Sequence, residues 1–155
     1  MSRIQAEIKQ TKPFPVAEEE AAVALQRTAD LMAQQITAVL KPHGISPAQY
    51  NVLRILRGAG KDGLPCGEVG NRMVTRDPDM TRLLDRMETR GLVARIREQK
   101  DRRVITARIT PEGEAMVGQL DRPIAELSVR QFSALTKAQL KTLVDLLDRL
   151  RELAD

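Results

Sequence analysis

The sequence has very few of the side chains on which most enzyme active sites and metal sites depend. Among 155 residues it has one cysteine (Cys66), one histidine (His43) and no tryptophan. A lone cysteine forms neither an intramolecular disulfide nor a cysteine-based zinc site, and no glycine-rich phosphate-binding loop is present. The sequence therefore predicts that the protein is not an enzyme and holds no metal or cofactor.

Aromatic residues and long apolar runs are equally scarce. Aromatic side chains make up 2% of the chain, so the core must be aliphatic, and platforms for stacking single-stranded bases are not expected. No apolar run approaches the roughly 20 residues that a membrane-spanning helix needs, and the N-terminus lacks the apolar stretch of a secretory signal. We expect a cytoplasmic protein with no membrane contact.

What the chain does have is apolar content and positive charge. Hydrophobic residues at 42% are enough for a core, and a length of 155 residues favours one domain. A net charge of +4 and a pI near 9.6 permit a nucleic-acid partner without requiring one.

The positive charge is concentrated in a predicted hairpin between Gly91 and Gly113. Apolar residues alternate with polar ones in two runs: Leu92, Ala94 and Ile96 face away from Arg95 and Arg97, and Ile105, Ala107 and Ile109 alternate with Thr106 and Arg108. From Arg95 to Arg108 there are six basic and two acidic residues, a net charge of +4 that equals that of the whole chain. An arginine-rich loop on a thin ribbon suits the DNA minor groove, and a solvated hairpin tip is the alternative.

Helix signals precede the hairpin. A long amphipathic helix is predicted from Val16 to about Lys41. Ser46 to Gln49 forms a capping box that begins the next helix, and a short helix is expected over residues 65–73. Asp77 and Pro78 are expected to cap and open a further helix that ends at Arg90, with a buried face of Met80, Leu83, Leu84 and Met87.

Two more helices follow the hairpin. Thr110 and Pro111 open the first, in which Pro123 is expected to kink or split the helix because proline lacks the N–H and crowds the preceding turn. Thr136 to Gln139 is a second capping box. The final helix carries an apolar stripe of Leu140, Leu143, Val144, Leu147, Leu150 and Leu153.

A helix, a short helix, a helix with a polar outer face and a hairpin, in that order, are typical of a winged helix-turn-helix. Three stretches then resemble the MarR family of bacterial transcription regulators: HGISPAQYNVLRIL from His43, DPDMTRLLDRMETRGLV from Asp77, and DRRVITARITPEG from Asp101. The resemblance covers about residues 16–152. The third stretch is the most specific, because it combines the wing motif with a downstream Thr-x-x-Gly.

The resemblance implies a mostly α fold with a small β-hairpin wing. Residues 45–111 would form the winged helix-turn-helix, and helices from both chain ends, 16–41 and 112–155, would form a dimerisation region. Residues 1–15 are expected to be an N-terminal arm. The apolar stripes that flank so short a reading domain also indicate, without the resemblance, that the terminal helices close on their copies in a second chain.

The family's DNA-contacting positions can be carried over to this sequence. In the recognition helix they fall on Arg76, Pro78, Asp79, Thr81 and Arg82, with Arg86 on the same polar face. In the wing they fall on Lys100, Asp101, Arg102 and Arg103, where the family's arginine enters the minor groove and its aspartate orients that arginine. An acid facing DNA is unfavourable unless it accepts from a cytosine amine, so helix capping is favoured over base reading for Asp79.

The function that the resemblance implies is that of a homodimeric, ligand-responsive repressor bound to a pseudopalindromic duplex. The ligand would be a small organic molecule between the first helix, the Tyr50 helix and the Pro123 helix. Its expected lining is Met32, Ile36, His43, Tyr50 and Arg54. Simple packing of Tyr50 and Arg54 at this junction is the alternative.

Other functions remain open at this stage. A non-specific architectural DNA-binding protein is the main alternative, since its affinity would also depend on basic side chains. A second alternative is a protein-interaction module that has lost DNA binding. It is less favoured, because the sequence retains Arg82 and the wing cations. The resemblance also allows a redox sensor, because some members of the family sense peroxides through a cysteine near the first helix. Cys66 lies away from that helix, so a structural role is favoured for it.

Overall fold

The computed structural model describes residues 1–152, so Leu153 of the predicted final stripe lies outside the described residues. Seven α-helices, two short 3-10 turns and three strands make up this part of the chain. They are α1 (Arg3–Glu7), α2 (Ala17–Leu40), η1 (Lys41–His43), α3 (Pro47–Ala59), η2 (Gly60–Asp62), β1 (Leu64–Pro65), α4 (Cys66–Asn71), α5 (Met80–Thr89), β2 (Val93–Arg97), β3 (Ile105–Ile109), α6 (Pro111–Gln131) and α7 (Lys137–Glu152).

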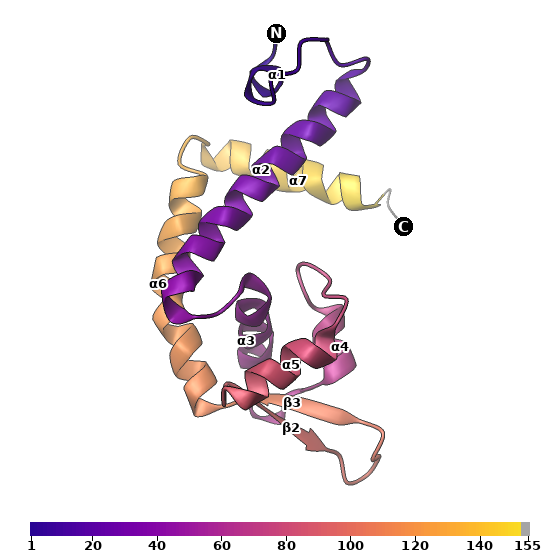
Figure 1. Cartoon of the computed structure of the whole chain (residues 1–155), viewed down its shortest axis with the longest axis vertical. Coiled ribbons are helices and arrows are strands. Elements are labelled where there is room, and N and C mark those ends of the chain that lie inside the picture. The colour runs from indigo at the N-terminus through magenta and orange to yellow at the C-terminus, as the bar shows by residue number, and fades with distance from the viewer. Residues whose placement is uncertain (153–155) are drawn as a thin grey trace.

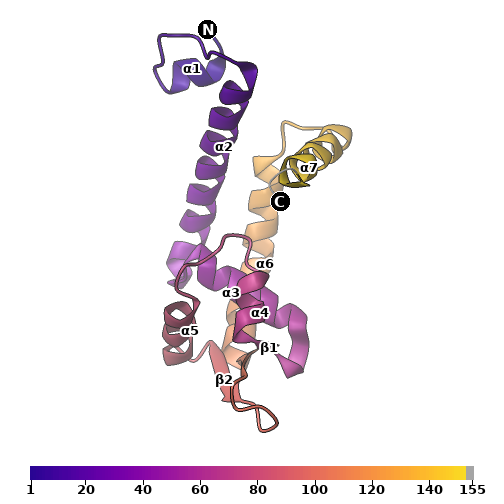
Figure 2. The ribbon, with the colours of Figure 1, turned by 90° about the vertical axis from the view of Figure 1, so that its right-hand side faces the viewer.

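The molecule is elongated, with a compact end and a helical end (Figures 1 and 2). The compact end holds α3, α4, α5 and the sheet, and the long helices α2 and α6 rise from it side by side. The side-chain amide of Gln131 in α6 donates to the carbonyl of Met32 in α2 at 3.3 Å. Helix α7 crosses α2 in Figure 1, but the turned view in Figure 2 shows that the two helices lie apart.

Three of the predicted helix starts are confirmed by their capping hydrogen bonds. Ser46 and Gln49 form a reciprocal capping box at α3, and Thr136 and Gln139 form another at α7. Thr110 caps α6 by accepting from the N–H of Gly113. These contacts satisfy N–H groups that a helix start otherwise leaves unpaired.

The core is aliphatic, as the composition predicts, and lies in the compact end. It joins α3, α5, the sheet and the first half of α6, with Leu40 reaching in from the end of α2. Burying one such side chain contributes on the order of 1.5–3 kcal/mol. The side chains that are almost fully buried are Leu40, Val52, Leu53, Leu56, Val69, Leu84, Met87, Val93, Val117 and Leu120.

The predicted hairpin forms, but its two faces are not those that the sequence pattern indicates. Opposite residues of an antiparallel pair lie on the same face, and the register places Arg95 opposite Ala107 and Ile96 opposite Thr106. Arg95 therefore shares a face with fully buried Ala107, whereas Ile96 is 44% exposed. The prediction of one apolar face that excludes Arg95 is wrong, because the alternation along each strand does not define which faces of the two strands coincide.

The sheet also contains a third strand that the sequence pattern does not reveal. β1 is two residues long and pairs with β3, with Leu64 opposite Ala107. The strand order is β1-β3-β2, so β2 is an edge strand.

Two helix predictions need correction. Asp77 and Pro78 are predicted to cap and open the recognition helix, but α5 begins at Met80 with Asp79 as its N-cap, because the side chain of Asp79 accepts from the N–H of Arg82. The second correction concerns the predicted split at Pro123, since α6 runs through this proline as one helix. Leu120 and Leu127, on either side of Pro123, are both buried.

The close approach of α6 to the sheet predicts a sharp difference between two glycine substitutions in α6. A Cβ at Gly113 would lie 2.2 Å from the carbonyl oxygen of Leu92, whereas a Cβ at Gly118 meets nothing within 4 Å. We expect Gly113→Ala to lower the free energy of unfolding by about 1–3 kcal/mol. Gly118→Ala, the matched control, should raise it by about 0.5–1 kcal/mol. Urea denaturation at one fixed protein concentration measures both, and equal effects would contradict the close approach.

Candidate nucleic-acid interface

The residues predicted to contact DNA lie on two neighbouring elements of the compact end, α5 with its preceding loop and the β2–β3 loop (Figure 1). All of the predicted residues are exposed, which leaves their side chains accessible. In and before α5 they are Arg76, Pro78, Asp79, Thr81, Arg82 and Arg86, and in the loop they are Lys100, Asp101, Arg102 and Arg103.

The sharp apolar–polar division of α5 follows from its sequence. Leu83, Leu84 and Met87 recur at helical spacing and are buried. Thr81, Arg82 and Arg86 fall on the opposite side and are exposed. The helix therefore offers an uninterrupted polar surface to a partner.

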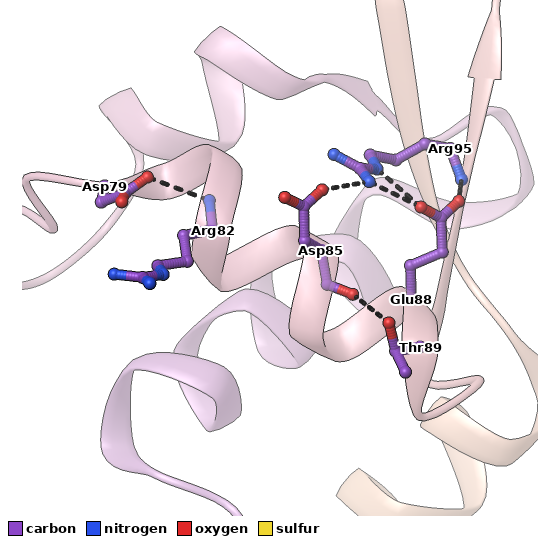
Figure 3. Close-up of polar contacts among 6 residues, drawn as sticks. All are labelled: Asp79, Arg82, Asp85, Glu88, Thr89 and Arg95. Atoms are coloured by element: carbon purple, nitrogen blue, oxygen red, sulfur yellow. Dashed lines mark hydrogen bonds and ion pairs between the residues drawn. The ribbon is translucent and has the colours of Figure 1, made fainter.

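The start of α5 is built by two aspartates. Asp77 accepts from the N–H of Asp79 at 2.8 Å, and Asp79 accepts from the N–H of Arg82 at 3.0 Å (Figure 3). Pro78 consequently lies in a turn before the helix rather than at its first position. A carboxylate at a helix N-terminus is stabilised by the helix dipole, which agrees with a capping role for Asp79.

The wing loop is folded around Asp101. The carboxylate of Asp101 accepts from the backbone N–H of Arg103 at 3.0 Å, and its carbonyl accepts from the N–H of Val104 at 3.0 Å. Asp101 thus orders the backbone of the tip, and the resemblance had implied a contact with the Arg103 side chain instead. The exposed side chains of Lys100, Arg102 and Arg103 are carried on this ordered turn.

Arg95 joins α5 to the wing, and sequence reasoning missed this contact. From β2, its Nε donates to Glu88 at 3.0 Å, its Nη2 to Glu88 at 2.6 Å and to Asp85 at 2.5 Å (Figure 3). Its backbone N–H also donates to Glu88, at 3.1 Å. The sequence signal for this cluster is weak. It consists of Asp85 and Glu88, which are about one helical turn apart, and of Arg95, which follows the turn at Gly91.

The contact between Arg95 and Glu88 favours the charged form of both groups. Hydrogen bonding to Arg95 holds the pKa of the Glu88 carboxyl below its ordinary value, and hydrogen bonding to Glu88 raises the pKa of the Arg95 guanidinium. Arg95 therefore offsets two negative charges on α5 that would otherwise lie close to the exposed arginines of the same helix.

A cavity of about 780 Å³ opens between α2, α3, α6 and the loop before α5. Three of the five predicted ligand-contacting residues line it, namely Ile36, Tyr50 and Arg54, whereas Met32 and His43 do not. Sequence reasoning missed the remaining wall, which includes Asn51, Met73, Val74, Thr75, Arg76, Asp77 and Ile124.

Met32 and His43 lie outside the cavity lining. The backbone carbonyl of Met32 accepts from Gln131 of α6, and His43 lies in the 3-10 turn after α2. Within the cavity, Nη1 of Arg54 lies 3.4 Å from the hydroxyl of Tyr50, and its guanidinium carbon is 5.9 Å from the ring centre. Arg54 and Tyr50 thus pack on each other along one wall.

The other sequence candidates are less informative. Burial raises the pKa of the Cys66 thiol, which favours its protonated form and a packing role. Among residues 1–152 no group of three or more histidine, cysteine or acidic residues is arranged to hold a metal ion. No helix in this part of the chain is long and apolar enough to span a membrane.

Comparisons with known proteins agree on one family. The sequence profile of the MarR family matches residues 43–104. The repressor MdtR of Bacillus subtilis is 27% identical over 133 residues, a match covering 86% of this chain and 84% of MdtR. The homoprotocatechuate degradative operon repressor of Escherichia coli is 28% identical over 127 residues, covering 81% of this chain and 84% of that protein.

Solved structures give the same result. A MarR transcription factor from Planctomyces limnophilus is 32% identical, with a TM-score of 0.68, covering 88% of this chain and 98% of its own. A mutant E. coli MarR complexed with operator DNA has a TM-score of 0.77 at 21% identity, covering 97% of this chain and 99% of its own. At that identity the second likeness concerns the fold.

Proposed function

Because the chain belongs to the MarR family of winged-helix transcription regulators, we propose that it acts as a homodimeric repressor at a pseudopalindromic operator and that a small organic ligand weakens its hold on DNA. The observation that carries this proposal is the pairing of an exposed arginine-bearing helix with an exposed arginine-bearing loop at one end of the molecule.

The two elements suit different parts of a duplex. The polar face of α5, with Thr81 and Arg82, has the width and chemistry to enter the major groove, where arginine pairs with guanine. The narrow loop with Arg103 at its tip suits the minor groove or the adjacent phosphates. Sequence preference would then come from α5, and much of the salt-dependent affinity from the wing.

Dimerisation is proposed from apolar surface that the single chain does not cover. Helix α7 has no buried residue among those described, and Val144 and Leu150 are 55% and 58% exposed. A second copy would bury this stripe, as isologous contacts between like surfaces do. The two α5 helices would then lie about one DNA turn, roughly 34 Å, apart.

Ligand control is proposed from the position of the cavity. Its wall includes Thr75, Arg76 and Asp77, which lead directly into α5. Arg54 and Arg76 supply cations on a largely apolar lining, and this combination favours an aromatic carboxylate. Such a ligand regulates only if it binds the DNA-competent and DNA-incompetent forms with different affinity.

The first test distinguishes base recognition by α5 from sequence-independent contacts made by the wing. Arg103→Ala should weaken binding to all duplexes and reduce the salt slope by about one charge. Arg82→Ala should instead cost about 1–3 kcal/mol of discrimination at one base-pair position. Selection from a random duplex pool, followed by titrations at several salt concentrations, measures both effects.

The control for this test is Arg122→Ala, since the Arg122 side chain is 88% exposed on α6, far from the interface. It should change neither affinity nor salt slope. If the wild type selects no common sequence and its affinity follows salt alone, the protein is an architectural DNA binder instead of a specific repressor.

The second test concerns assembly. Replacing Leu143 and Leu147 with glutamate would bury unpaired charge in the proposed interface, and we expect monomers or unfolded chains in light scattering. Lys141→Glu, on the exposed side of the same helix, should remain dimeric. A wild-type mass of a single 17.3 kDa chain at micromolar concentration would refute the dimer.

The third test concerns the cavity. Salicylate should lower operator affinity by about tenfold, equivalent to about 1.4 kcal/mol of coupling. Arg54→Met should weaken this response by removing one of the two cations that line the cavity, and His43→Ala, outside the cavity, should retain it. A response that is identical in all three proteins would place the ligand elsewhere.

A further inference from the structure

Arg95 differs from the other arginines of the hairpin in its surroundings. Its side chain is 21% exposed, whereas Arg97, Arg102 and Arg103 are exposed. The register places Arg95 opposite Ala107 of the core, on the face of β2 that meets α5. A guanidinium in this position is held away from the outer surface on which the wing cations lie.

Four hydrogen bonds from Arg95 converge on α5. Three come from the guanidinium and reach Glu88 twice and Asp85 once, and the fourth comes from the backbone N–H and reaches Glu88. β2 is an edge strand, so the carboxylate of Glu88 satisfies an N–H that no further strand covers. The contact is therefore built from both the main chain and the side chain of one residue.

The direction of these bonds matters because the other side-chain contacts described between α5 and the hairpin are apolar. A backbone bond from the N–H of Leu92 to the carbonyl of Met87 lies in the connecting turn, before β2 begins. Leu84 and Met87 of α5 and Val93 of β2 belong to one core cluster, and hydrophobic attraction is non-directional. A planar guanidinium fork between two carboxylates one helical turn apart has far stricter geometry. Arg95 thus supplies the directional restraint on the angle between α5 and β2.

We propose that Arg95 is a positioning residue, which holds the wing at a fixed angle to the recognition helix so that both elements engage one duplex at the same time. This inference rests on the proposed function and adds a residue to it. Arg95 has a second effect through charge, because it offsets Asp85 and Glu88, which would otherwise repel the phosphates near Arg82 and Arg86.

A double-mutant cycle tests positioning directly. With Arg95 present, Arg103→Ala removes a wing contact that is in register with α5, and we expect about a tenfold loss of operator affinity. In an Arg95→Met background the wing no longer engages in register, so the same change should cost less than about twofold, the non-additivity expected of coupled residues. An equal cost in both backgrounds would overturn the proposal.

The salt dependence of binding supplies a readout that a loss of stability does not mimic. Arg95→Met should retain the base preferences beneath α5 and reduce the salt slope by about one charge, because the wing loses its phosphate contact. General destabilisation would instead lower affinity by the same factor at every salt concentration. Arg95→Lys keeps the charge but not the fork, and should restore affinity only in part. Arg108→Met is the matched control, because Arg108 of the neighbouring strand donates to the carbonyl of Asp62, away from α5.

Two provisions keep the outcome decisive. If Arg95→Met does not fold, as judged by circular dichroism, Asp85→Asn combined with Glu88→Gln removes the carboxylates while retaining their shape, and the same cycle with Arg103→Ala applies. Wild-type protein is measured first, so a wild type that selects no sequence refutes the proposed function. Specific wild-type binding with an additive cycle refutes only the role of Arg95.

Discussion

Helix α5 buries one face against the core while its opposite face stays exposed to solvent. The arrangement of the rest of the compact end depends on this constraint. Leu83, Leu84 and Met87 fill the core beneath the helix, which leaves its polar surface on the outside. Hydrophobic burial determines which face of α5 lies on the core, but it is non-directional and restrains the angle between α5 and β2 only weakly. The ion pairs of Arg95 with Asp85 and Glu88 add a directional restraint on that angle (Figure 3).

Directional polar contacts also tie the compact end to the long helices. Arg57 of α3 makes a two-pronged contact with Asp121 of α6, with both distances 2.8 Å, and this bond lowers the pKa of the Asp121 carboxyl. Arg90, just beyond α5, donates to the carbonyl of Gly44 at the end of α2 at 2.5 Å. Both contacts join the compact end to segments that precede or follow it in the chain.

Several errors of sequence interpretation share one origin, which is that they concern residues far apart along the chain. The hairpin pattern suggested a solvent-facing Arg95, because the alternation was counted along each strand and not across the pair. Strand β1 escaped notice because Leu64 and Pro65 form a strand only by pairing with β3. Met32 is expected in the ligand lining, but it is not among the residues that line the cavity, and its backbone carbonyl accepts from Gln131 of α6.

The sequence by itself determined the starts of α3, α6 and α7, the aliphatic core, the hairpin with its basic tip and the membership of the family. Helix caps and hydrophobic periodicities involve residues only a few positions apart, so they can be recognised without knowledge of the fold. Only the tertiary structure decided the strand register, the partner of Arg95 and the walls of the cavity. A shift of one residue in register exchanges the two faces of a strand, and only contacts between distant segments select among such registers.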